Sequence, residues 1–323
     1  MLADTNPAAI ASLSHADAFA HLVRKINAQP IETDPFPHIY LEEVFPAGYY
    51  RALLERIARV GEFVPTLYPG VAVDLDAKSF KDYGLTCRNF DKDEELACLY
   101  ALLKSEPFSR LLLDKFSAPE SWGARGSAIP AEKHVFFKEG RENFTCVFDL
   151  HKDLPGYEIS PHPDVPSKIV TFLFYFTPDE SLSRFGTKLC RVKPECKATL
   201  ARATRSKMSS LLVGATRPFV GKSYGLDQKD SWFPWEMFDV VKVAPAKPNS
   251  LLVFAPNADS YHAIRMDIPP DHPLRERQTL RGFIRSGKNT DNYVGGYSHG
   301  VGRSVLFKMA RRFGAHRAAP GNN

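Results

Sequence analysis

The spacing of hydrophobic residues changes along the chain near residue 133. Before that point apolar residues recur every three or four positions, as at Phe19, Leu22 and Ile26, and this spacing predicts an amphipathic helix over 16–28. Asp91, with Glu94 three residues later, is the expected N-cap of a further helix. The same reasoning predicts a mainly helical N-terminal third, with helices at 46–57, 91–103 and 107–116 and a short strand at 38–41.

After residue 133 the apolar segments become shorter, richer in β-branched and aromatic residues, and separated by proline and glycine. These segments predict strands at 133–138, 143–150, 156–161, 168–177, 187–192, 238–244, 250–255, 261–267 and 277–286. Many short strands joined by turns are typical of a jelly roll or another closed two-sheet β fold. We therefore expect an α+β protein with a mainly β core and N-terminal helices packed on it.

The pattern divides the chain into three regions. They are a mainly helical region at 1–130, a β core at 131–287 with a long insert at 201–237, and a basic tail at 288–323. The insert carries Trp232, Phe233 and Trp235 near its end. Loops of this length are usually functional or disordered, and two roles stay open for these aromatic residues. They pin the loop to the sheet, or they form a lid over a substrate.

The composition restricts the class of protein. Of 323 residues 44% are hydrophobic and 24% charged, which is ordinary for a soluble globular chain. No apolar run is long enough to span a bilayer, so no transmembrane segment is expected, and the N-terminus lacks the pattern of a secretion signal. The 5 cysteines form no C-x-x-C pair and are expected to be free thiols. These features favour a cytoplasmic protein.

The net charge of +5 is confined to the tail. Five lysines and arginines and no acidic residue follow position 302, and removing them from the 42 basic residues leaves 37, which equals the number of acidic residues. A neutral body argues against a broad nucleic-acid-binding surface, because such a surface would place the excess charge on the folded domain.

Candidate chemistry gathers around the predicted strand at 168–177. His162 and Asp164 are two residues apart, so on extended backbone their side chains share a face. With a second histidine, His262, they would form a two-histidine, one-carboxylate site, which binds Fe(II) and leaves coordination positions open. Each residue alone has a simpler explanation, such as a hydrogen-bonded pair or a core histidine.

On the last predicted strand Arg277 and Thr279 share a face and could together bind a carboxylate.

The order of these motifs resembles the signature of Fe(II)/2-oxoglutarate-dependent oxygenases. H-x-D at 162–164, a distal histidine after NSLLVF at 249–254, and R-x-T at 277–279 occur in the family's order. PGYEISPHPD at 155–164 and GTKL at 186–189 are similar to the prolyl-hydroxylase-like branch. The resemblance covers about residues 133–286 and implies a double-stranded β-helix.

The resemblance also implies roles for residues. His162, Asp164 and His262 would be the catalytic Fe(II) ligands, and Arg277 would bind the distal carboxylate of 2-oxoglutarate. Thr279 would add a hydroxyl to that carboxylate, and ascorbate is a further possible cofactor.

Two roles stay open for Tyr157: it contacts the co-substrate, or it packs beneath the metal site. The expected partners are dioxygen and a small-molecule or peptidyl substrate. The expected reaction is hydroxylation of an unactivated C–H bond of a small metabolite, a biosynthetic intermediate or a peptidyl residue, with release of succinate and carbon dioxide.

Two departures from the family pattern concern the substrate. The His162–His262 spacing is long because of the insert, and Arg277 lies fifteen residues after His262, beyond a proline-rich segment. Two other classes of protein stay open: a non-catalytic β-roll that binds a metal or a sugar, and an interaction protein. The sequence names no substrate, because substrate-facing loops follow no transferable code.

Overall fold

The computed structural model describes residues 15–61, 63–65, 84–87, 90–117, 129, 144–164, 168–200, 233–257 and 259–286. The predicted strand at 133–138, Trp232 with most of the insert, and the basic tail lie outside the described residues. Within the described ranges, no helix combines the length and the hydrophobicity that crossing a membrane requires. The three-region division proposed from the sequence stays a prediction.

Helices α1 to α4 all lie before residue 118 and strands β4 to β11 follow them, as predicted, while β1, β2 and β3 lie between the helices. The helices are α1 (His15–Ala28), α2 (Ala47–Ile57), α3 (Glu94–Lys104) and α4 (Glu106–Ser117). The strands are β1 (His38–Glu42), β2 (Val64–Pro65), β3 (Gly84–Cys87), β4 (Phe144–Asp153), β5 (Glu158–His162), β6 (Lys168–Tyr175), β7 (Thr187–Val192), β8 (Phe238–Ala244), β9 (Ser250–Phe254), β10 (His262–Arg265) and β11 (Arg277–Ser286). The predicted bounds of β7, β8 and β11 agree with the structure at both ends.

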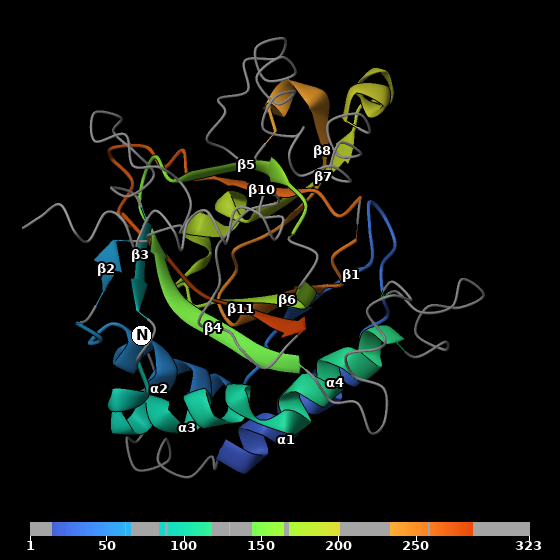
Figure 1. Cartoon of the computed structure of the whole chain (residues 1–323). Helices are drawn as coiled ribbons and strands as arrows, with labels where there is room; N and C mark the ends of the chain where they lie inside the picture. The colour runs from blue at the N-terminus through green and yellow to red at the C-terminus, as the bar shows by residue number, and fades with distance from the viewer. Residues whose placement is uncertain are drawn as a thin grey trace, which may run out of the picture.

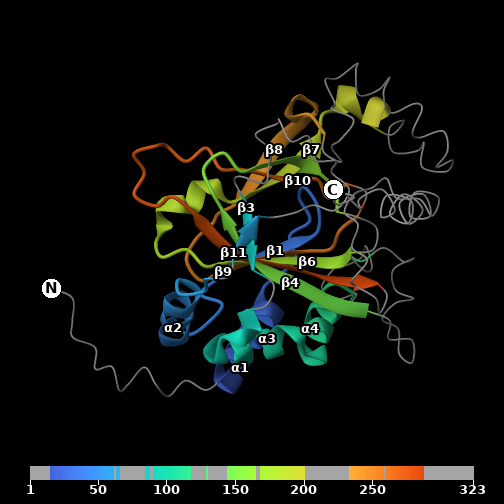
Figure 2. The same ribbon diagram turned by 60° about the vertical axis from the view of Figure 1, so that its left-hand side comes forward.

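The strands form two antiparallel sheets, one above the other in Figure 1. The larger sheet has seven strands in the order β1-β9-β6-β11-β4-β3-β2, and the smaller has four in the order β5-β10-β7-β8. From β4 to β11 the chain crosses repeatedly between the sheets. The helices cover the side of the large sheet that faces away from the small one, as the turned view in Figure 2 also shows. The molecule therefore has three layers.

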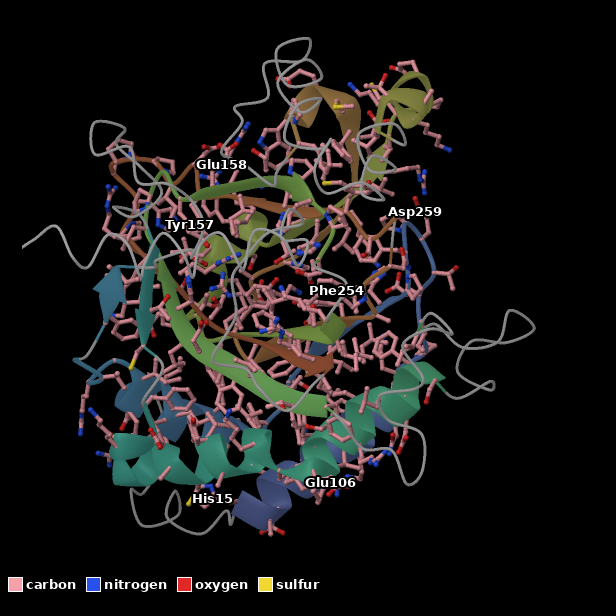
Figure 3. All side chains as sticks on the ribbon, viewed as in Figure 1. His15, Glu106, Tyr157, Glu158, Phe254 and Asp259 are labelled. Atoms are coloured by element: carbon pink, nitrogen blue, oxygen red, sulfur yellow. The ribbon has the colours of Figure 1, made fainter. Side chains whose placement is uncertain are left out.

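One face of the large sheet packs against the helices and forms the main core. Phe172 in β6 meets Phe108 in α4 with ring centroids 5.3 Å apart, and both side chains are fully buried. Because side chains alternate along a strand, Thr171 and Tyr175 of β6 point the other way, between the sheets. Phe254 of β9, labelled in Figure 3, lies in that inner space too.

Three local features differ from the sequence prediction. The short strands β2 and β3 were not predicted, because segments of two and four residues carry too little periodicity. They extend the large sheet beyond β4. Helix α3 is capped by Asp93, whose Oδ1 accepts from Leu96 N at 3.1 Å, and not by Asp91, which lies in a preceding 3₁₀ turn.

A packing prediction follows from Gly282 at the centre of β11. A Cβ atom there would lie 2.2 Å from Phe172 Cζ and 2.8 Å from Phe148 Cβ. Gly282→Ala should therefore lower the free energy of unfolding by about 1–3 kcal/mol, measured by urea denaturation. Gly61→Ala is the matched control, because no described atom lies within 4 Å of its Cβ position. Equal stability of the two variants would contradict the packing described here.

Candidate metal centre

Strand pairing brings two histidines together at the edge of the inner space. His162 ends β5, His262 begins β10, and the two residues are direct partners in the register of the small sheet. Their ring centroids lie 4.4 Å apart. Asp164 follows His162 by two residues, and one ligand atom from each of the three residues lies within 4.8 Å of the others. The structure therefore groups the three predicted metal ligands.

A β-bulge in β5 gives His162 its direction. His262 pairs with His162, but Ile264 pairs with Ile159, so β5 contains one more residue than β10 over this stretch. The extra residue lets Ile159 and His162 share a face although they lie three positions apart. Ile159 and Ile264 are buried in one cluster. Both histidines are thereby turned to the same side of the small sheet.

Backbone carbonyls orient the two imidazole rings. His162 Nδ1 lies 2.9 Å from Ser160 O, and His262 Nδ1 lies 3.1 Å from Ser260 O. A carbonyl only accepts, so each Nδ1 carries the proton and each Nε2 keeps a lone pair. This arrangement is the usual support for a histidine that binds a metal through Nε2.

Asp164 is held through both carboxylate oxygens. The Thr171 hydroxyl donates to Oδ2 at 2.5 Å, and the Lys168 ammonium forms an ion pair with Oδ1. Burial alone would raise the pKa of Asp164, but the charge and hydrogen bond of Lys168, together with the neighbouring His262 and His162, hold that pKa well below its usual range. The carboxylate is therefore ionised and fixed. Neither Lys168 nor Thr171 was singled out from the sequence.

A second charged cluster lies where β11 pairs with β4. Arg277 and Asp153 are register partners, and Asp153 Oδ2 accepts from Arg277 Nε at 3.0 Å and Nη2 at 2.5 Å. Arg277 Nη1 donates to Phe185 O at 2.7 Å, and His151 Nδ1 lies 2.9 Å from Asp153 Oδ1. Burial would raise the pKa of Asp153, but Arg277 holds it well below its usual range. Arg277 is thus buried, as predicted, but already paired with an acid.

The other predicted co-substrate residues lie around this cluster. Thr279 is buried and is the register partner of both His151 and Tyr175. The Arg277 guanidinium lies 5.5 Å from the centre of the Tyr175 ring, and the Tyr175 hydroxyl lies 2.7 Å from Thr187 Oγ1.

Tyr157, labelled in Figure 3, is buried with its ring centroid 5.7 Å from that of His151. It therefore lies beside the charged cluster of β4 and β11.

The described end of the insert packs away from the histidines. Phe233 and Trp235 join a cluster with Ala263, whose side chain leaves β10 on the face opposite His262. Phe233 N donates to Pro161 O at 2.9 Å, and Trp235 Nε1 donates to Glu158 Oε1 at 2.5 Å. For these two residues the structure favours the pinning role over the lid.

A pH prediction follows from the neutral histidines. Burial and the neighbouring His262 lower the pKa of His162 to about 3, and burial also lowers that of His262. Below the ordinary histidine pKa the unfolded chain takes up protons that the folded chain does not. The unfolding free energy of the metal-free protein should therefore fall as the pH drops, by up to about 1.4 kcal/mol per pH unit for each histidine.

Urea denaturation in chelator, from pH 7 to about 4, measures this dependence. The double variant His162→Asn, His262→Asn should show a shallower slope. An unchanged slope would show that neither histidine is held neutral by burial.

No protein-family model matches the chain, and no curated protein sequence matches it. Among solved structures it is similar to a prolyl 4-hydroxylase from Pseudomonas putida (14% identity, 82% of this chain and 98% of that one, TM-score 0.37). It is also similar to a prolyl 4-hydroxylase from Phytophthora capsici (13% identity, 94% of this chain and 76% of that one, TM-score 0.43).

A third similar structure is HygX from Streptomyces hygroscopicus, solved with nickel, 2-oxoglutarate and hygromycin B (11% identity, 80% of this chain and 91% of that one, TM-score 0.38). These TM-scores are all below 0.5, so the functional conclusion depends on the residues of the site.

Proposed function

We propose that the chain is an Fe(II)- and 2-oxoglutarate-dependent dioxygenase built on a double-stranded β-helix. One observation carries the proposal: the side chains of His162, Asp164 and His262 meet between the two sheets. Because each histidine Nδ1 is bonded to a backbone carbonyl, both Nε2 atoms keep a lone pair for a metal ion. β6 links this group to the buried guanidinium. Thr171 of β6 binds Asp164, and Tyr175, on the same face of that strand, lies beside Arg277.

The three ligands suit Fe(II). Two neutral imidazoles and one carboxylate on one side of the ion leave three of its six positions open. Iron held there would supply, with dioxygen, the oxidising power for decarboxylation of 2-oxoglutarate and oxidation of a substrate C–H bond. The carboxylate of Asp164 favours hydroxylation over halogenation, because halogenases of the oxygenase superfamily that this chain resembles lack a carboxylate ligand at the metal.

Arg277 is the proposed anchor for the distal carboxylate of 2-oxoglutarate. Of its five N–H groups, three are bonded to Asp153 and Phe185 O, which leaves one on each terminal nitrogen for a further acceptor. Two parallel N–H groups match a carboxylate in geometry. Thr279 would add its hydroxyl, and Tyr157 would pack against the cluster.

The proposed substrate is a small metabolite, a biosynthetic intermediate or a peptidyl residue. Succinate release would separate this function from a β-roll that only binds a metal or a sugar. The test is reconstitution with Fe(II) and 2-oxoglutarate, admission of dioxygen, and measurement of succinate with and without candidate substrates.

His162→Ala, Asp164→Ala and His262→Ala should each abolish Fe(II)-dependent succinate release and keep the fold, because each removes one of three ligands. Succinate assay and circular dichroism are the measurements. His21→Ala is the matched control, since His21 is on α1 and its Nε2 contacts Glu43 O. Near-normal activity of a ligand variant with iron bound would show that the residue is not a ligand.

The Arg277 prediction needs a compensated variant. Removing Arg277 alone would take the guanidinium partner from the buried Asp153 carboxylate, and the loss of one partner of a buried ion pair typically costs about 3–5 kcal/mol of stability. We expect Arg277→Gln with Asp153→Asn to raise the KM for 2-oxoglutarate by about thirtyfold or more, the loss of about 2 kcal/mol of charged hydrogen bonding. Asp153→Asn alone should keep a low KM. An unchanged KM in the double variant would exclude Arg277 as the anchor.

A further inference from the structure

Lys168 places an ammonium group inside the candidate metal centre. It is the first residue of β6, its side chain is buried, and Nζ forms an ion pair with Asp164 Oδ1. Nζ also lies 3.9 Å from the centre of the Phe283 ring, on the neighbouring strand β11. A ring face at this distance stabilises a cation. The ammonium is therefore held between a carboxylate and an aromatic ring.

The ammonium contacts the oxygen that faces the histidines. Asp164 Oδ1 lies 3.9 Å from His262 Nε2, whereas Oδ2 accepts the Thr171 hydroxyl. Oδ1 is thus the oxygen directed to the position that a metal ion would take.

Two opposing consequences follow from a fixed positive charge at this position. Without a metal ion it offsets the charge of the buried Asp164 carboxylate. When a divalent ion enters, two positive charges compete for one carboxylate, and like charges repel strongly away from water.

We propose that Lys168 competes with the metal ion for Asp164, stabilising the metal-free protein and weakening metal binding. Lys168 is a positioning residue, since it acts through Asp164. This inference depends on the metal centre of the proposed function and is independent of the reaction and its substrate.

The test measures metal affinity in place of activity. Lys168→Met keeps the length of the side chain and removes its charge. Its dissociation constant for Co(II), measured anaerobically by calorimetry, should fall about tenfold or more, which corresponds to about 1.4 kcal/mol. Its melting temperature in chelator should also fall, because Asp164 loses its counter-charge. Lys168→Gln is the second variant, in case the methionine variant does not fold.

Thr171→Val is the matched control. It removes the hydrogen bond to the other oxygen of Asp164 without changing a charge, so Co(II) binding should weaken. Variants of Lys168 that bind Co(II) no more tightly than the unaltered chain would overturn the inference, and they would show that Lys168 merely orients Asp164. An unaltered chain that does not bind Co(II) would overturn the metal centre of the proposed function, and this inference with it.

Discussion

The pairing of β5 with β10 determines the geometry of the whole site. It sets His162 directly opposite His262, and the bulge in β5 turns both rings to the inner side of the small sheet. Each ring is then fixed by a backbone carbonyl two residues earlier in the chain. A shift of the pairing by one residue would place every following side chain on the opposite face. The strand register therefore determines which side chains can reach the metal site, and side-chain contacts only fix their orientation.

The inner space between the sheets contains buried charges in pairs. Arg277 with Asp153 and Lys168 with Asp164 are nearly excluded from water. Such pairs add little net stability compared with apolar residues of similar size, because the loss of hydration offsets much of their attraction, but the removal of one partner is costly. The helices and the outer face of the large sheet form a separate apolar core, in which Phe108 and Phe172 are fully buried. The fold can therefore hold a polar site on one face of a sheet whose other face supplies the stability.

The outer face of the small sheet binds the described end of the insert. Glu158 binds Trp235 and, at 2.9 and 3.0 Å, Arg265, and the Arg265 guanidinium lies 4.5 Å from the Trp235 ring. These contacts attach the described end of the insert to the back of the strands that carry the histidines. Aromatic residues in a long loop suggested two roles, and only the folded chain distinguishes them for Trp235.

The sequence by itself determined the character of most elements and the main ligand candidates. β11 was predicted as a strand with Arg277 and Thr279 on one face, and His162, Asp164 and His262 were selected by residue type and order. Both kinds of information can be read along the chain, because neither requires knowing which distant residues meet in space. Ion pairing is not local: Arg277 meets Asp153 across 124 positions of sequence.

Only the tertiary structure decided which charges meet. Lys168 is four residues from Asp164, yet its position in the sequence did not distinguish it from other lysines. Its direction follows from the start of β6 and from its contact with the ring of Phe283, on a strand more than a hundred residues later. A side chain is directed by the strands that pair beside it, and strand order is a property of the folded chain.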